Sequence, residues 1–285
     1  MMVDGVTRFM EVFHSETPDR VGPVRSARST DIDLFSNLNR PIFVWSGGNG
    51  GVTAEIHEAV NAGLITEVVD DGGKNGPIFY RDSSRRVGVE HTLMADLVQV
   101  RAQRTPPDPT TPKPIFTYRP LGTTLTGGGA APAAGITVTM TYFNNTSLTN
   151  KSDWAWDPAG SCWKRWHQRP GTDPQPLAHV DSNGAQVCPA NVVVLFVPVG
   201  PDVRIDARTP KAESVGTGKG FVLADGKAAA INWARNSPTD PWTFADDAGQ
   251  PVSLTPGKTW VELADAANDK ADILDEAQAQ ALLGS

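Results

Sequence analysis

The first hundred residues alternate between strand-like and helix-like patterns of apolar and polar positions. Alternating or short apolar runs predict strands over 6–13, 41–45, 65–69 and 78–80. Apolar residues that recur every three or four positions predict helices over 31–38, 53–64 and 92–100. Because strands and helices follow one another in this way, we expect residues 1–103 to form a layered α/β domain.

From residue 135 onward the pattern is one of strands and turns. Residues 136–142 alternate cleanly, and residues 191–199 are mostly apolar, like a strand that is buried on both faces. Ala224-Asp225-Gly226-Lys227 predicts a tight hairpin turn. We therefore expect a mostly β domain over 135–263, followed by a polar terminal helix or tail over 264–285.

The composition changes sharply between these two regions. Residues 105–114 are rich in proline and predict a semi-rigid linker. Residues 127–134 are rich in glycine and alanine and predict a flexible surface loop. We assign the linker and the loop together to 104–134 and expect the domain boundary to lie there.

Length and charge limit the classes of protein to which this chain can belong. The 285 residues provide room for one large domain or two medium ones. The formal net charge of −7 argues against nucleic acid as a partner, because affinity for nucleic acid rests on clustered Lys and Arg. No stretch approaches the roughly 18 apolar residues of a membrane span, and the first residues do not have the pattern of a signal peptide.

Residues 21–31 form the most informative polar cluster. Arg25 and Arg28 lie between a predicted strand and a predicted helix, where Ser29 or Thr30 is placed to cap a helix that begins at Asp31. A helix N-terminus attracts anions, and a guanidinium group binds carboxylate or phosphate through two parallel hydrogen bonds. The alternative is structural, with both arginines paired to nearby carboxylates, namely those of Asp19, Asp31 or Asp33.

A second polar cluster follows the strand predicted over 78–80. It contains Arg81, Asp82 and Arg85, with His91 a few residues later, and Arg81 beside Asp82 fits a structural pair or a ligand contact. The glycine-rich loop 46–51 precedes a predicted helix and could contact an anion through its backbone N–H groups. It lacks the Gly-Lys-Ser/Thr motif of a P-loop, and the alternative is a tight turn into the helix.

The C-terminal region offers weaker signals. His179 and Asp181 would share a strand face as a general-base pair or as two metal ligands, but no third ligand is close in sequence. Trp154 and Trp156 would also share a face, either as part of the core or as an exposed pair that stacks on sugar rings. No serine has the setting of a catalytic nucleophile, and we expect no cofactor and no bound metal.

Several motifs occur together in an order that resembles one known family. They are Gly5-Val6-Thr7-Arg8-Phe9, Val21-Gly22-Pro23-Val24-Arg25-Ser26-Ala27-Arg28, Phe79-Tyr80-Arg81-Asp82, His179-x-Asp181, Asn191-Val192-Val193-Val194 and Pro256-Gly257-Lys258-Thr259-Trp260. Through them the chain resembles the YerB-like family of bacterial exported lipoproteins, a domain-of-unknown-function family. The family usually has a Pro-His-Asn triplet where this chain has Glu90-His91-Thr92, which weakens a catalytic interpretation of His91.

The resemblance implies an α+β fold, with a three-layer α/β sandwich N-terminal domain followed by a smaller, mostly β C-terminal domain. Family members carry further residues before this point, so we expect this chain to be truncated at its start, without the export signal and the lipid anchor. An extracytoplasmic location at the cell envelope is also implied. In an exported protein Cys162 and Cys188 would form a disulfide, whereas in the cytosol both would be ordinary buried thiols.

The resemblance names no reaction, because the family has no assigned function. We expect a non-enzymatic protein that binds an anionic cell-envelope component or another envelope protein. The alternatives are an envelope hydrolase or transferase that acts on an anionic glycan or phosphate, and a protein-interaction module. The residues expected to bind the ligand are Arg8, Arg25, Ser26, Arg28, Asp31, Arg81, Arg85 and His91.

Overall fold

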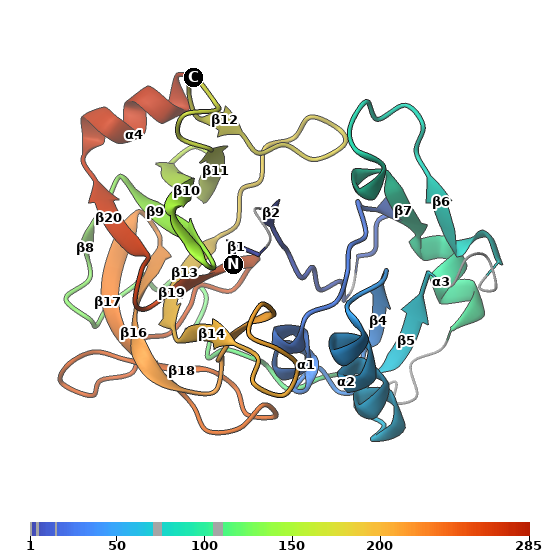
Figure 1. Ribbon diagram of the computed structural model, residues 1–285. Coiled ribbons are helices and arrows are strands. Elements are labelled where there is room, and N and C mark those ends of the chain that lie inside the picture. Colours follow the sequence, from blue (N-terminus) through green and yellow to red (C-terminus); the bar gives the residue numbers. More distant parts are fainter. Residues whose placement is uncertain (1, 4–5, 15, 71–75, 105–110) are drawn as a thin grey trace. The chain divides into compact units, whose positions relative to one another are not determined.

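The computed structural model describes residues 2–3, 6–14, 16–70, 76–104 and 111–285 (Figure 1). The chain forms two compact units. The β unit consists of Met1–Phe9, Pro114–Pro201 and Ala212–Ser285, and the α/β unit consists of Met10–Lys113 and Asp202–Lys211. This is the mixed α+β class that the sequence predicts. The central part of the expected proline linker, residues 105–110, lies outside the described residues.

The α/β unit contains short helices and two small sheets. Its elements are β3 (Arg20–Val21), α1 (Ser29–Phe35), β4 (Ile42–Trp45), α2 (Gly50–Asn61), β5 (Thr66–Val69), η1 (Gly76–Ile78), β6 (Phe79–Arg81), η2 (Val89–His91), β7 (Leu93–Asp96) and α3 (Leu97–Gln103). One sheet has the antiparallel order β3-β7-β6, and the other is the parallel pair β4-β5.

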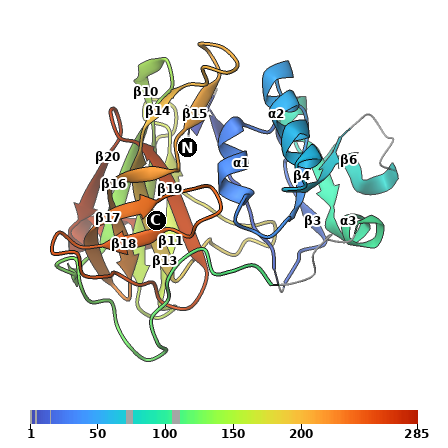
Figure 2. The same cartoon turned by 90° about the horizontal axis from the view of Figure 1, so that it is seen from below.

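The parallel pair β4-β5 is covered on both faces. Trp45 packs with Phe35 of α1 and Ile56 of α2, and these two helices lie side by side (Figure 2). Val44 points to the other face, where it packs with Ala95 of β7 and Val100 of α3. Small sheets packed with helices are thus established for this unit, and the complete three-layer sandwich stays a prediction.

Two predicted elements of the N-terminal region were wrong. The helix expected over 92–100 is strand β7 followed by helix α3, because Leu93 and Ala95 alternate inward along a strand while the Asp96 carboxylate caps α3 by accepting the Gln99 N–H at 2.9 Å. Leu93, Leu97 and Val100 are spaced as on a helix, which explains the error. The strand expected over 6–13 is limited to β2 (Val6–Thr7), which pairs with β1 (Met2–Val3).

The β unit is built almost entirely of strands. After β1 and β2 its elements are β8 (Ala131–Pro132), β9 (Gly135–Tyr142), β10 (Asn145–Asp157), β11 (Cys162–Gln168), β12 (Leu177–Ala178), β13 (Asn191–Val197), β16 (Gly216–Ala224), β17 (Lys227–Arg235), β18 (Thr243–Ala245), β19 (Thr259–Asp265), β20 (Lys270–Leu274) and α4 (Glu276–Leu283). Strands β14 (Val199–Pro201) and β15 (Pro210–Ala212) lie at the two ends of the segment 202–211.

Apart from the two-stranded pairs β1-β2 and β14-β15, the strands of the β unit form two sheets that pack face to face (Figure 1). One sheet has the order β12-β11-β10-β9-β20. The other has the order β18-β17-β16-β13-β19, in which β13 and β19 are parallel and β8 pairs with β17. A single core cluster contains Ile136 and Trp154 from the first sheet and Val192 and Leu223 from the second. Burial of residues from both sheets in one cluster defines a β-sandwich.

The β unit is larger than the sequence suggests, because segments on both sides of 135–263 join its sheets. Residues 131–132 of the predicted loop form β8, and residues 270–274 of the predicted tail form β20, which pairs with β9. Helix α4 follows, and its residues Ala279 and Leu282 are buried beside Trp166. The tail is therefore part of the folded unit rather than an exposed extension.

Two local predictions for the β unit are confirmed. In the hairpin between β16 and β17, Ala224 pairs with Lys227, and Asp225 and Gly226 adopt φ values of 53° and 68°, as a type I′ turn requires. Cys162 and Cys188 form a disulfide, with their Cα atoms 5.3 Å apart. Among the described residues, no helix combines the length and the apolar character that a membrane crossing needs.

Candidate functional site

In the α/β unit the structure joins the two polar clusters that the sequence singles out. Arg25 lies between β3 and α1, and His91 ends the short helix η2. Nη1 of Arg25 is 2.8 Å from Nδ1 of His91, although the two residues are 66 positions apart. Both side chains are half-buried. We call Arg25, Arg81, Arg85 and His91 the arginine cluster.

The contact with Arg25 determines the proton position on His91. A guanidinium can only donate, so Nδ1 of His91 accepts and the ring proton lies on Nε2. That atom is 3.5 Å from Oε1 of Glu90, whose side chain is 57% exposed. Both nitrogens of the imidazole are therefore engaged, and its lone pair is directed at Arg25 rather than at a substrate.

Arg81 and Arg85 donate to the backbone around η2. Nη1 of Arg81 lies 2.6 Å from the carbonyl oxygen of Val89 and 3.3 Å from Oγ1 of Thr92. Nε of Arg85 lies 3.0 Å from the carbonyl oxygen of His91. These acceptors are neutral, so the bonds hold the loop in place without cancelling the charge of either guanidinium.

The arginine cluster retains its positive charge. Among the described residues, no carboxylate forms an ion pair with Arg25, Arg81 or Arg85. The nearby carboxylate of Asp82 instead accepts the hydroxyl and the backbone N–H of Ser84 at 2.6 and 2.9 Å. These two bonds, and to a smaller extent the charge of Arg85, lower the pKa of Asp82.

The remaining residues of the expected site have other positions. Nη1 of Arg28 donates to the carbonyl oxygen of Ala27 at 2.7 Å, and the Asp31 carboxylate accepts the Arg28 backbone N–H at 2.8 Å. Helix α1 begins at Ser29, with Arg28 as its N-cap, so the prediction that Ser29 or Thr30 caps the helix was wrong. The Asp31 carboxylate is therefore bound to the backbone of the N-cap residue at the start of α1.

Two further parts of the expected site are set by the backbone. The run that contains Ser26 lies along the glycine-rich loop, because the Ser46 N–H donates to the Arg25 carbonyl and the Ala27 N–H donates to the Gly47 carbonyl, at 3.0 and 3.1 Å. The loop ends where Asn49 caps α2 by accepting the Val52 N–H at 2.9 Å. Arg8 belongs to the β unit.

The β unit contains a buried charged cluster that the sequence analysis missed. The Arg165 guanidinium, only 3% exposed, lies 3.7 Å from the Glu262 carboxylate and 3.0 Å from Nδ1 of His179. Its central carbon lies 4.9 to 5.6 Å from three ring centres, those of Trp260, Phe9 and Trp154. We call this group the buried arginine cage. The sequence offered two signals for this cage. They are the charged residue Arg165, close to Trp163 and Trp166, and the charged residue Glu262, within the apolar run of β19.

The cage also changes the interpretation of His179. Burial, followed by the charge of Arg165, lowers the pKa of His179 from its ordinary value of 6.5 to about 4. The Asp181 carboxylate binds the backbone N–H groups of Asn183 and Ala185 in its own turn, so the two side chains do not act as a pair. Within the described ranges no group of three His, Cys, Asp or Glu residues could hold a metal ion.

The tryptophans of the β unit mostly serve its core. Trp154 and Trp163 are completely buried, and Trp166 is 2% exposed. Trp156 is half-buried, with its ring centre 5.1 Å from that of Trp163. Of the two alternatives for Trp154 and Trp156, the exposed pair is therefore wrong: Trp154 belongs to the core, and Trp156 alone of the two contributes to the surface.

Comparisons with known proteins place this architecture in a family. Residues 1–107 match the N-terminal domain, and residues 138–261 the C-terminal domain, of a family described as protein of unknown function DUF3048. The chain belongs to this family.

A solved structure agrees with this assignment. The chain is similar to the crystal structure of YerB protein from Bacillus subtilis, with a TM-score of 0.67 over 91% of this chain and 80% of that chain. The two sequences are 19% identical, so the likeness establishes the shared fold alone. No curated protein matches the sequence. The family that the motifs predict is confirmed.

Proposed function

We propose that the protein works outside the cytoplasm, at the cell envelope, where the arginine cluster of its α/β unit binds an anionic ligand. The disulfide supports the compartment, because disulfides persist in oxidising environments and are rare in the cytosol. The ligand would be an anionic envelope component, such as a phosphate-bearing polymer or an acidic surface of another envelope protein.

The observation that carries the proposal is the charge of the cluster. Arg25, Arg81 and Arg85 converge on residues 89–92 and bind neutral acceptors there, and no carboxylate of the described residues forms an ion pair with them. Arg81 and Arg85 are exposed, so water or a ligand can reach their remaining N–H groups. Guanidiniums suit the planar geometry of carboxylate and phosphate, and an acidic chain otherwise repels such ligands.

The same geometry favours binding over catalysis. A general base needs a lone pair that is directed at the reacting group, and the Nδ1 lone pair of His91 accepts from Arg25 at 2.8 Å. The other ring nitrogen faces Glu90. The arrangement therefore offers donors for an anion, and the histidine beside them has no lone pair free to act as a general base.

Calorimetric titration of the whole chain with inorganic pyrophosphate and with a poly(glycerol phosphate) oligomer tests the proposal. We expect binding that weakens as salt is added, because exposed charges are screened. Arg85→Ala should weaken it about tenfold or more, since a hydrogen bond to a charged group contributes roughly 1.5–3 kcal/mol. Arg25→Lys keeps the charge but loses the planar group, so its effect should be intermediate.

The matched control is Arg101→Ala, which removes an exposed arginine from α3, outside the cluster. It should leave both titrations unchanged. If neither probe binds the parent protein, or if Arg101→Ala weakens binding as much as Arg85→Ala does, the cluster is not the anion site.

A further inference from the structure

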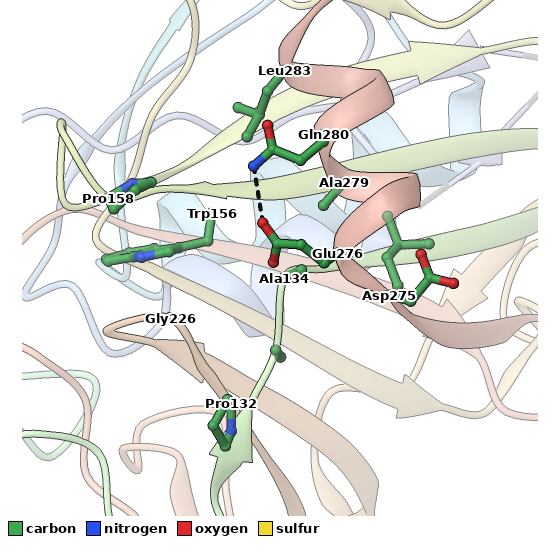
Figure 3. Close-up of a pocket in the computed structure, with 12 residues that line it drawn as sticks. Pro132, Ala134, Trp156, Pro158, Gly226, Asp275, Glu276, Ala279, Gln280 and Leu283 are labelled. Carbon is green, nitrogen blue, oxygen red and sulfur yellow. Dashed lines mark hydrogen bonds between the residues drawn. The ribbon is translucent and has the colours of Figure 1, made fainter.

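A pocket of about 420 Å³ opens at the surface of the β unit, beside helix α4 (Figure 3). One wall is the helix, and the other walls come from β10, the β8 segment and the β16–β17 turn. The residues that matter for its chemistry are Trp156, Pro132, Pro158, Leu283, Glu276 and Gln280. No basic side chain lines the pocket.

Trp156 provides a flat aromatic surface whose position is fixed from several sides. Its backbone N–H donates to the Ala134 carbonyl at 2.9 Å, and its ring packs on Trp163. The ring also lies against the hairpin turn at Gly226, where a Cβ atom would be only 2.9 Å from the indole Nε1. A glycine with φ +68° therefore both forms the turn and leaves room for the indole.

Glu276 and Gln280 provide a polar pair on the facing wall. They lie one turn apart on α4, and Nε2 of Gln280 donates to Oε1 of Glu276 at 2.9 Å. In Figure 3 both side chains lie on the side of α4 that faces Trp156, whereas the Asp275 carboxylate points away. Asp275 instead caps the helix by accepting the Gln278 N–H at 2.8 Å. The second carboxylate oxygen and the amide oxygen remain available as acceptors, and the amide retains a second N–H.

We propose that this pocket binds a saccharide unit that carries no negative charge. The apolar face of a sugar ring would stack on the indole of Trp156, with the proline rings and Leu283 at its edges, and its hydroxyl groups would bond to Glu276 and Gln280. A planar carboxylate and a planar amide, held together by their own bond, suit neighbouring hydroxyls that both donate and accept.

The negative charge of Glu276 excludes acidic sugars from the pocket. The carboxylate of Glu276 lines the pocket without a basic neighbour there, so it repels phosphate, sulfate or uronate groups. The preference is thus the reverse of that proposed for the arginine cluster, and the two sites are independent. Failure of one leaves the other standing.

Titration of the whole chain with four tetrasaccharides tests the inference. The probes are cellotetraose, a β-1,4-linked N-acetylglucosamine tetramer, the corresponding glucosamine tetramer and a galacturonic acid tetramer. At least one of the first three should bind with a dissociation constant of roughly 1 mM or tighter. The galacturonic acid tetramer should bind at least about tenfold more weakly than the best of them.

Variants locate the binding in the pocket. Glu276→Gln and Gln280→Ala change exposed side chains and should weaken binding of the best probe about threefold to tenfold. Trp156→Phe keeps a smaller ring and should weaken it severalfold. The control Ala277→Gln adds an exposed side chain to α4 outside the pocket lining and should change nothing.

Four results would overturn the inference. They are no binding of any uncharged or amino saccharide, equal binding of the galacturonic acid tetramer, displacement of the saccharide by tetramethylammonium at equal concentration, and equal weakening by Ala277→Gln and Gln280→Ala. The third result would indicate a site for organic cations instead, because a tryptophan face beside a carboxylate also suits a quaternary ammonium group.

Discussion

The two units contain the same contact in opposite surroundings. In the α/β unit Arg25 donates to Nδ1 of His91 at 2.8 Å, and in the β unit Arg165 donates to Nδ1 of His179 at 3.0 Å. Arg25 is half-buried and has no carboxylate partner among the described residues. Arg165 is almost completely buried and shares its cage with Glu262.

The difference shows that burial and charge balance, more than residue identity, separate a binding site from a structural one. In the cage the charge of Arg165 is balanced by the Glu262 carboxylate at 3.7 Å, and three aromatic rings of the same unit surround the guanidinium, so no external anion is needed. In the arginine cluster the guanidiniums of Arg81 and Arg85 bind neutral backbone carbonyls, so their positive charge is not balanced by these bonds.

Removal of the buried charge of Arg165 should cause the largest loss of stability. Arg165→Met leaves the Glu262 carboxylate buried without its partner, and breaking a buried pair in this way costs roughly 3–5 kcal/mol of unfolding free energy. Urea denaturation followed by tryptophan fluorescence measures the loss, because seven of the eight tryptophans follow residue 150 and belong to the β unit.

The double variant Arg165→Met/Glu262→Leu is the matched control. It removes both charges, so it should recover a large part of the lost stability. If the single and the double variants are equally unstable, packing of the arginine stem rather than its charge holds the cage together.

Loss of the disulfide should cause the next largest loss of stability. Cys162 begins β11, the strand that carries Arg165, and its partner Cys188 is 26 positions away. Replacement of both by alanine should reduce the unfolding free energy of the β unit by about 3 kcal/mol in the chain-entropy view. Thiol titration of the denatured, unreduced parent should find no reactive thiol, and two reactive thiols per chain would contradict the bond itself.

Local patterns in the sequence predicted much of the fold, and contacts between distant segments explain the rest. The strand Asn191–Val197 and the turn at Asp225 and Gly226 depend on neighbouring residues, and both were anticipated. The division of 92–100 into β7 and α3 was not, because three apolar residues fit a helix and a strand–helix junction equally well.

For the candidate sites, too, the sequence did not show which distant residues meet. The sequence identified Arg25 and His91 separately, but only the fold brings them together across 66 positions. It could not show that Arg28 turns back to its own backbone. The buried arginine cage was missed because Arg165 and Glu262 come from different strands, β11 and β19, and neither has a recognisable motif.

Acid should destabilise the β unit through His179. The pKa of this group is lowered from 6.5 to about 4 in the folded protein, so its contribution is complete above about pH 6.5 and is lost as the pH falls toward 4. Below pH 6.5 the unfolded chain binds a proton that the folded chain does not. The slope stays below about 1.4 kcal/mol per pH unit, since the half-exposed ring is screened by solvent.

The variant His179→Gln should flatten this slope. Urea midpoints of the parent and the variant, followed by tryptophan fluorescence between pH 4 and 7, provide the measurement. Equal slopes in the two proteins would show that His179 titrates normally and that the cage does not exclude its charged form.

The smallest stability change should come from Arg25, the counterpart of Arg165. Arg25→Met removes one hydrogen bond, which contributes roughly 0.5–1.5 kcal/mol because the guanidinium is only half-buried and water screens its charge, and it leaves no buried carboxylate behind. The bonds from Arg81 and Arg85 to the Val89 and His91 carbonyls still hold the loop. We expect a loss of about 1 kcal/mol or less in the α/β unit, together with a clear loss of pyrophosphate binding.

Hydrogen exchange of the amides in β5 and β7 reports on this unit, for which fluorescence has only Trp45 as a probe. Should Arg25→Met destabilise these strands as strongly as Arg165→Met destabilises the sandwich, Arg25 would be a structural clamp like its counterpart, and the contrast between the two pairs would disappear.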